Sequence, residues 1–162
     1  MLLRIIKILL ILSIAAWALV GALGNLVDWA GTMGAVEAAT SMSTFDPGPT
    51  SGRATTNGAV ILLGALFIVL LKVTTGALCL FGAWQMWGAR GGDGVDFAKA
   101  KSLALAGCGV ALFMLFAGWI VIAETWFEMW RSPAMIDLAL NSAFRYAGMI
   151  GVMALFVGAR EE

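Results

Sequence analysis

One stretch of the chain limits the possible folds more than any other feature. Residues Asn57–Trp87 form a run of 31 residues in which Lys72 is the only charged side chain. About 20 apolar residues suffice to cross the hydrocarbon core of a membrane as a helix. A charge near the middle of such a helix costs ~2.5–3.5 kcal/mol on insertion scales and tends to face protein or water. We therefore expect a membrane-spanning helix in which Lys72 is a functional site, a partner contact or a snorkelling side chain.

The composition of the whole chain also indicates an integral membrane protein. Of its 162 residues, 61% are hydrophobic and 12% are charged, whereas about 25% of the residues of a soluble domain are charged. A net charge of zero gives no basic surface for nucleic acid. Histidine is absent, and Cys79 and Cys108 lack the spacing of metal ligands. We therefore expect no metal site and no cofactor.

Four largely uncharged segments predict an all-α fold, a four-transmembrane-helix bundle formed by residues 1–162 as a single domain. Arg145 interrupts the last of these segments, so we expect its side chain to snorkel or to pair with an acid on a neighbouring helix. The predicted spans cover residues 8–27, 58–87, 102–126 and 136–158.

Two segments are expected to lie outside the membrane on the outer face. The first is a 26-residue loop, 31–56, which is rich in turn-forming residues and has a short surface helix at 35–40. The second is a protruding hairpin, because the helical pattern of the third span continues to Arg131. Ser132 and Pro133 then form a helix start signal, with serine as N-cap and proline in the first turn.

The distribution of basic residues predicts the orientation. If the N-terminus is inside, the glycine-rich connection 88–101 is also inside, and positive residues favour that side of the membrane. We therefore expect both termini to be cytoplasmic. The inner segments would hold Arg4, Lys7, Arg90, Lys99, Lys101 and Arg160, and the outer ones Arg53, Arg131 and Arg145.

Five short motifs carry a resemblance to a protein family. In their order and spacing they resemble the small bacterial integral membrane proteins that are grouped as a domain of unknown function and found mainly in proteobacteria. The resemblance covers nearly the whole chain and implies four spans in the bacterial inner (cytoplasmic) membrane, but it implies no activity. The motifs are Gly24-Asn-Leu-Val-Asp28, Ser41-Met-Ser-Thr-Phe45, Leu80-Phe-Gly-Ala-Trp84, Trp126-Phe-Glu-Met-Trp130 and Ala143-Phe-Arg-Tyr146.

The candidate contact residues are the charged side chains in or beside the spans and three tryptophans at the end of the third span. The tryptophans fall at i, i+7 and i+11, roughly one face of a helix, which suits packing, anchoring at the lipid interface or docking to a larger complex. The full set is Lys72, Arg145, Glu124, Asp28, Trp119, Trp126 and Trp130.

The polar residues inside the spans are few and form no recognisable pair of nucleophile and base, so we do not expect an enzyme. We expect a non-catalytic accessory or structural subunit, or an assembly factor, of a larger inner-membrane complex, for example a respiratory or photosynthetic one. Its partners would be the lipid bilayer and that complex, or further copies of the chain. The alternative is a small transporter or channel that uses Lys72 and Arg145 as in-membrane charges. Four short helices leave little room for a pore, which favours the first interpretation.

Overall fold

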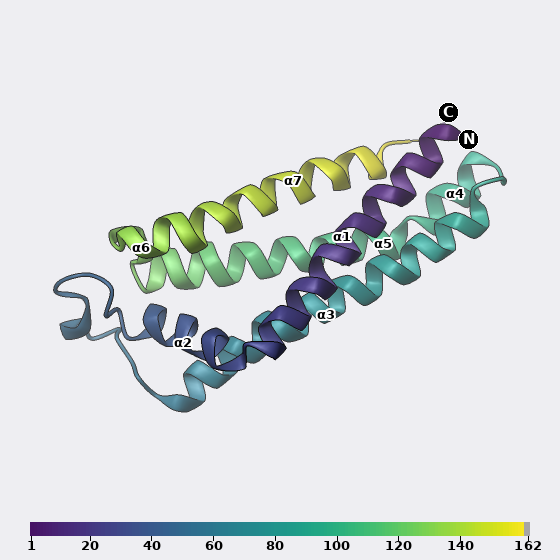
Figure 1. The fold of residues 1–162 in the computed structure, drawn as a ribbon. Helices are drawn as coiled ribbons and strands as arrows, with labels where there is room; N and C mark the ends of the chain where they lie inside the picture. Colours follow the sequence, from purple (N-terminus) through teal and green to yellow (C-terminus); the bar gives the residue numbers. More distant parts are fainter. Residues whose placement is uncertain (161–162) are drawn as a thin grey trace.

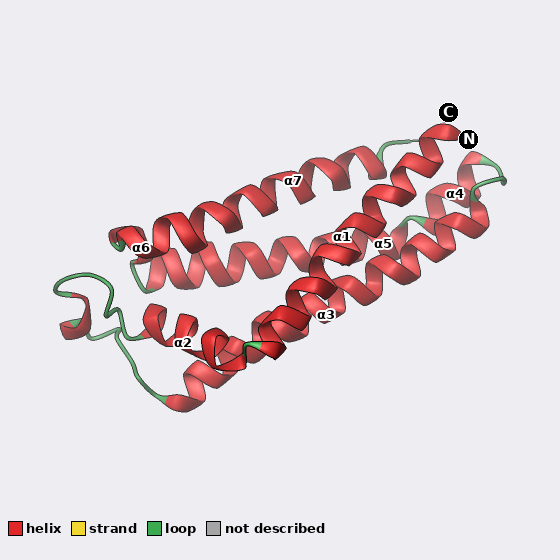
Figure 2. Ribbon diagram, in the orientation of Figure 1, coloured by secondary structure: helices red, strands yellow, loops and turns green. Residues whose placement is uncertain are grey.

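A computed structural model describes residues 1–160, apart from the side chain of residue 138, and over that range the chain forms helices and turns without a strand (Figures 1 and 2). The last two residues of the expected single domain lie outside the described residues. The elements are α1 (Leu2–Val27), α2 (Trp29–Thr40), η1 (Gly48–Thr50), α3 (Gly58–Ala89), α4 (Gly94–Ala100), α5 (Ser102–Phe113), η2 (Met114–Trp126), η3 (Met129–Arg131), α6 (Pro133–Met135), η4 (Ile136–Leu140) and α7 (Asn141–Gly158).

Three helical segments are long and apolar enough to cross a membrane, namely α1, α3 and the stretch 94–126 formed by α4, α5 and η2. They confirm an all-helical membrane protein and match the first three predicted spans. Helix α1 begins at Leu2, earlier than predicted. The fourth predicted span is helical through α6, η4 and α7, but it is not among the described segments that reach this length and hydropathy.

The long helices lie side by side (Figure 1). Helix α1 packs on α3, α3 on α5, and α7 on both α5 and α1. The core between them is built from small and aliphatic side chains, among them Ile11 and Ala15 of α1, Cys79 of α3 and Cys108 of α5. Both cysteines are free and buried. Small residues at these contacts let the helices approach closely, which is how helices associate in lipid.

Basic side chains define one end of the molecule, where both termini lie (Figure 1). Lys7 and Lys101 are 1% and 2% exposed, and both donate to the carbonyl of Ala159, over 3.1 and 2.8 Å. Arg4 donates to the carbonyl of Arg90 over 2.9 Å. These carbonyls lie at the C-terminal ends of α7 and α3, where cations satisfy orphan acceptors and the helix dipole. We call this the basic end and the opposite one the outer end.

The predicted loop 31–56 is shorter than expected, because residues 31–40 belong to α2. The Asp28 carboxylate accepts a hydrogen bond from the backbone N–H of Gly31 over 2.9 Å and starts that helix. The connection 88–101 likewise contains α4. There Asp93 accepts from the N–H of Asp96 over 2.8 Å, and Phe97 is fully buried.

The hairpin at the outer end also differs from its prediction. The helix ends at Trp126 instead of continuing to Arg131, because Glu128 adopts a left-handed backbone with φ 54°. The N-cap at Ser132 is confirmed, since its hydroxyl accepts from the N–H of Met135 over 3.2 Å.

The hairpin is also not free to protrude alone. Phe127 and Met129 form a second apolar core together with Ala39 and Met42, which come from the segment before α3. The loop and the hairpin therefore fold as one outer unit.

We predict that Gly82→Ala destabilises the protein and that Gly88→Ala does not. A Cβ at Gly82 would overlap the backbone N and Cα of Ala104 in α5, whereas a Cβ at Gly88 meets nothing within 4 Å. Overpacking of this kind costs ~1–3 kcal/mol, and the control gains up to ~1 kcal/mol of helix propensity. Thermal unfolding in detergent, followed by circular dichroism, measures both. Equal melting temperatures for the two variants would contradict the tight contact between α3 and α5.

Candidate functional site: a polar layer beside Lys72

Lys72 is half-buried between α3 and α1. Its ammonium group donates to the side-chain oxygen of Asn25 over 2.6 Å and lies 3.5 Å from the carbonyl oxygen of Gly21. A Cβ at Gly21 would lie 3.2 Å from Lys72 Nζ, so the glycine makes room for the ammonium group. Among residues 1–160, Lys72 forms no ion pair with Glu124 or with any other carboxylate.

Asn25 connects Lys72 to a third helix. Its side-chain N–H donates to Thr32 Oγ1 over 2.9 Å, and the Thr32 hydroxyl donates back to the backbone carbonyl of Asn25 over 3.0 Å. Asp28, which starts α2, lies between the two in the chain and also accepts from the backbone N–H of Thr32 through its carbonyl, over 3.0 Å. We call Gly21, Asn25, Asp28, Thr32 and Lys72 the polar layer, and it joins α1, α2 and α3.

The height of the polar layer follows from helix geometry. Asn25 lies 18 residues after Lys7 in α1, a rise of about 27 Å, which is close to the ~30 Å hydrocarbon thickness of a bilayer. Helix α3 has 32 residues and is therefore about 48 Å long. Lys72 lies near the middle of this helix, and its ammonium group meets α1 at the height of Gly21 and Asn25. Its depth in a membrane stays a prediction.

Arg145 of α7 lies at nearly the same height along the molecule as the ammonium group of Lys72. Lys7 and Ala159 meet at the basic end. Gly21 and Arg145 each lie 14 residues from that contact, or about 21 Å along their helices. Arg145 donates to Ser142 Oγ over 3.4 Å and lies 5.5 Å from the ring of Tyr146. The expected acid on a neighbouring helix is not found among the described residues.

The three tryptophans do not share one face. Trp119 is partly buried against both apolar cores, whereas Trp126 and Trp130 are exposed. Two causes act. Trp119 and Trp126 lie in η2, a π-helix whose i→i+5 bonds wind more residues into each turn than an α-helix does. Trp130 lies beyond the end of that helix, after the left-handed Glu128. Glu124 and Trp130 instead line one cavity of about 300 Å³ between η2, η4 and α7.

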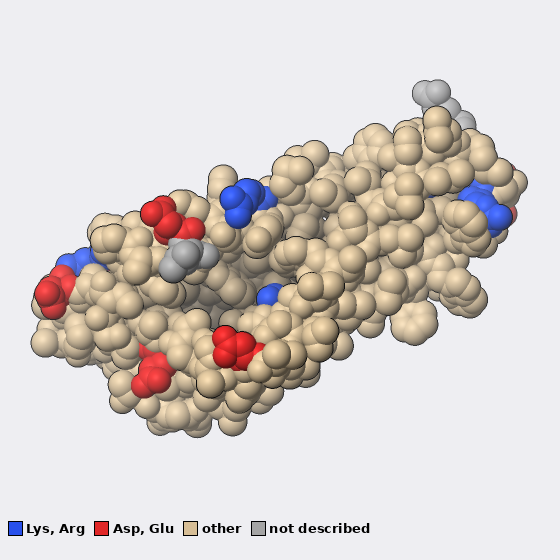
Figure 3. Space-filling view, in the orientation of Figure 1, with Lys and Arg blue, Asp and Glu red and all other residues tan. Residues whose placement is uncertain are grey.

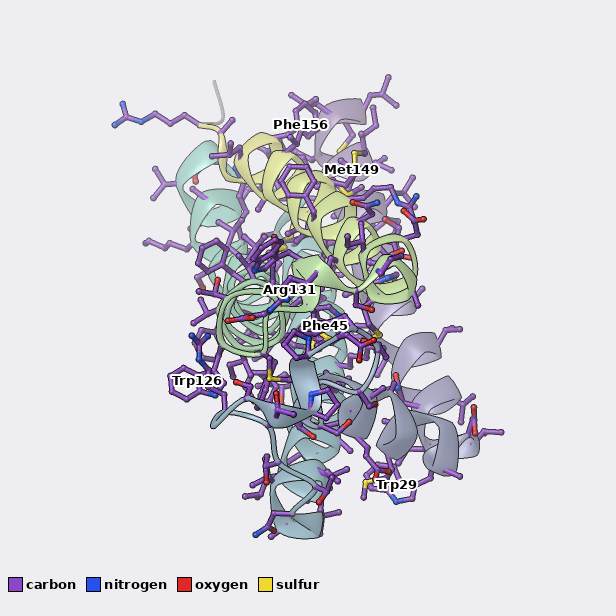
Figure 4. The ribbon with its side chains drawn as sticks, turned by 90° about the vertical axis from the view of Figure 1, so that its left-hand side faces the viewer. Trp29, Phe45, Trp126, Arg131, Met149 and Phe156 are labelled. Atoms are coloured by element: carbon purple, nitrogen blue, oxygen red, sulfur yellow. The ribbon has the colours of Figure 1, made fainter. Side chains whose placement is uncertain are left out.

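A charged clamp at the outer end was missed in part by sequence reasoning. Glu128 pairs with Arg53 over 3.3 Å and with Arg131 over 3.0 Å. Arg131 also donates to the carbonyl of Asp46 over 3.1 Å and lies 4.9 Å from the ring of Phe45 (Figure 4). Glu128 and Arg131 are an i, i+3 pair that the sequence predicts as a pair at a helix end. The contacts of Arg53 with Glu128 and of Arg131 with Asp46 join residues more than 70 positions apart, so no local pattern predicts them.

The clamp also explains where Trp126 lies. Arg53 donates to the Trp126 carbonyl over 3.1 Å and lies 5.7 Å from its ring, while that ring points away from the body of the molecule (Figure 4). Phe45 and Trp126 belong to the second and fourth motifs of the sequence. That shared membership is the one sequence signal linking the loop to the hairpin. Within residues 1–160, no three acidic or thiol side chains gather closely enough to hold a metal ion.

Comparison with protein families matches residues 3–160 to the family described as "predicted small integral membrane protein (DUF2165)". The chain belongs to this family. The match confirms the resemblance to small integral membrane proteins of unknown function and spans every residue of the polar layer and the clamp. Comparisons of this DUF2165 protein with curated proteins and with solved structures found no match.

We predict that Asn25→Leu destabilises the DUF2165 protein by about 1.5–3 kcal/mol, the contribution of a hydrogen bond to a charged group. Removing the amide leaves the Lys72 ammonium group without its 2.6 Å acceptor. In a Lys72→Met background the same substitution should cost much less, because no charge is left without a partner. Unfolding of the four proteins of this double-mutant cycle in mixed micelles measures the coupling. Additive effects would show that the contact contributes nothing.

Proposed function

We propose that this DUF2165 protein is a non-catalytic accessory or structural subunit, or an assembly factor, of a larger complex in the bacterial inner membrane. The observation that carries the proposal is an apolar surface on the part of α3 that extends beyond the polar layer. The 14 residues from Gly58 to Leu71 precede Lys72 and extend about 21 Å farther out.

Large apolar side chains on this part of α3 have no cover in the isolated chain. Leu63, Leu66 and Leu70 lie at i, i+3 and i+7, hence on one helical face, and all three are exposed, Leu63 by 66%. Contiguous apolar patches on a surface mark contact with a protein or a membrane. The patch is defined here as these three leucines.

A protein partner suits this patch better than lipid does. The patch lies beyond Lys72 and Asn25, in the half of the molecule that also carries the clamp of Arg53, Glu128 and Arg131. In Figure 3, charged side chains lie at the basic end and over the outer half, whereas the stretch between them is uncharged on this face. Ion pairs with exposed members are typical of a region in contact with water. In such a region an apolar patch is stabilised when the surface of a partner protein covers it.

The outer unit is also suited to docking because it is ordered before any partner arrives. Its second apolar core and the clamp fix the loop against the hairpin. A preorganised surface loses little conformational entropy on binding, which favours association.

We further propose four spans with both termini in the cytoplasm. The segment of α6, η4 and α7 follows the same path as the other three, since Ala159 reaches Lys7 and Lys101 at the basic end and Arg145 matches the height of Gly21. The basic end carries most of the arginines and lysines, and cytoplasmic segments are enriched in these residues.

This topology can be tested with single cysteines. Ser43 and Lys99 are exposed at opposite ends of the molecule, and the two native cysteines are buried. In intact cells, a membrane-impermeant thiol reagent should label Ser43→Cys, while Lys99→Cys should react only after the inner membrane is opened. The reverse pattern would invert the topology.

The partner proposal predicts that the tagged protein, solubilised from native membranes in mild detergent, co-purifies with other membrane subunits at stoichiometric yield. Leu63→Glu should remove these subunits yet leave expression and folding intact, because the patch lies outside the hydrocarbon core. Leu80→Glu is the matched control in the same helix: Leu80 is 44% exposed within the crossing, where a charge costs ~2.5–3.5 kcal/mol, so insertion should fail.

Two outcomes would overturn the proposal. If Leu63→Glu impairs insertion as strongly as Leu80→Glu, the patch faces lipid. If the native protein purifies alone as a stable monomer, there is no complex, and the transport alternative with Lys72 and Arg145 becomes the one to test by flux measurements.

A further inference from the structure

We propose that Lys72 and Arg145 bind the phosphate headgroup of an anionic phospholipid, whose acyl chain lies in the crevice between α1 and α7. The proposal does not depend on the partner complex. It rests on the position of the two cations, on their lack of carboxylate partners within residues 1–160 and on the apolar crevice below them.

The ammonium group of Lys72 is paired but not neutralised. Its two acceptors are the amide oxygen of Asn25 and the backbone carbonyl of Gly21, at 2.6 and 3.5 Å, and both are uncharged. A half-buried cation at the edge of an apolar region is stabilised by a charged acceptor. A charge-assisted hydrogen bond to a phosphate is stronger than a hydrogen bond between neutral groups.

Arg145 lies on α7 next to Tyr146, the residue of α7 that contacts Trp17 of α1. On α1, Trp17 and Gly21 are four residues apart and share a face. Trp17 contacts Tyr146 of α7 with 5.4 Å between ring centroids, and Gly21 contacts Lys72. The Lys72 amine therefore emerges on the side of α1 that looks toward α7. Arg145 precedes Tyr146 and lies one turn above Met149 on α7, at the height of Gly21.

An apolar crevice lies between α1 and α7, closer to the basic end than these cations. It has a volume of about 160 Å³ and lies between Ile14 and Trp17 of α1 and Tyr146, Met149 and Met153 of α7. Its lining suits a hydrocarbon chain. The cations lie about 21 Å from the Lys7–Ala159 contact, in the outer part of a core of ~30 Å, from where a long basic side chain can snorkel toward the phosphates of the outer leaflet. The cations that would bind the headgroup therefore lie farther from the basic end than the crevice that would hold the acyl chain, which is the order of these groups in a phospholipid of that leaflet.

The occupant we assign is a lipid and not a free anion, because the crevice gives the binding site an apolar half that soluble phosphate cannot use. An anionic lipid is favoured over a zwitterionic one because two cations lie at nearly the same height and, among the described residues, neither forms an ion pair with a carboxylate. Figure 3 shows a basic side chain on the floor of a hollow in this face, so such a group is accessible from the side of the molecule.

The test reconstitutes the purified protein in mixed vesicles of phosphatidylglycerol and phosphatidylcholine. It is then extracted with a membrane-active polymer, and native mass spectrometry counts the retained lipids. The wild type should retain phosphatidylglycerol above its share of the vesicle. Lys72→Gln combined with Arg145→Gln should lower this retention about tenfold, as expected for the loss of charge-assisted hydrogen bonds. Lys99→Gln removes an exposed charge at the basic end and should change nothing.

A second variant tests the crevice without touching a charge or the polar layer. Ser13 lies at the crevice, is exposed and bonds only to its own helix, at Leu10, so Ser13→Phe should fill the space and leave the fold intact. Retention should fall as it does in the double charge variant. Melting curves of every variant identify those that fail to fold, and Ser13→Phe keeps the proposal testable if Lys72→Gln is one of them.

Three results would overturn the proposal. Retention of both lipids in the proportion supplied would exclude selectivity for the anionic headgroup. Unchanged retention in the folded variants would exclude these residues and this crevice. If inorganic phosphate displaces phosphatidylglycerol and alone raises the melting temperature of the lipid-free protein, the site binds soluble anions and the lipid assignment is wrong.

Discussion

A bilayer core of ~30 Å accepts apolar side chains and rejects unpaired polar groups, and this condition sets the two heights at which the DUF2165 protein places its polar contacts. At the basic end, Lys7 and Lys101 satisfy the last carbonyl of the final helix. About 27 Å away along α1, Asn25 receives Lys72 and passes a hydrogen bond on to Thr32. Between these heights the helices are held by small and aliphatic residues. From the two polar heights we propose how the molecule sits in a membrane, and the proposals about partner and lipid both depend on that placement.

The same constraint explains why α3 is longer than a crossing requires. The part of α3 from Lys72 to Ala89 is about 27 Å long, close to the thickness of a bilayer core, and we propose that the rest of the helix supports a second structure outside it. Helix α2 packs on α3, and Arg131 of the hairpin holds the loop through Asp46 and Phe45. The outer unit is thus attached to α3, a helix long and apolar enough to cross a membrane. The surface of the outer unit therefore keeps a fixed position relative to the other long helices, which suits the proposed role as a subunit.

The sequence predicted well whatever depends on local composition. The uncharged run around Lys72 indicated α3, and Ser132 with Pro133 indicated the start of the last helical segment. It predicted poorly whatever depends on contacts between distant segments. The height of Lys72 is set by Asn25, which is 47 residues away, and the clamp joins Arg53 to Glu128. The tryptophan stripe failed for local reasons, because its period assumed one α-helix where the chain forms a π-helix that ends at Trp126, before Trp130. An uncapped stretch such as 31–56 reads as a loop, yet one aspartate at position 28 is enough to start a helix there.

Lys72 has a positive charge that the packing of α1 against α3 does not require. Asn25 offers an amide oxygen, and a neutral donor such as glutamine would satisfy it without bringing a charge into the apolar region. Lysine adds a full charge that two neutral oxygens do not balance, and such a charge is costly inside a bilayer core. Arg145 repeats the situation at the same height, bonded to a serine of its own helix. Two cations in equivalent positions, with an apolar crevice below them, are explained together by one anionic, chain-bearing ligand and are left unrelated by packing alone.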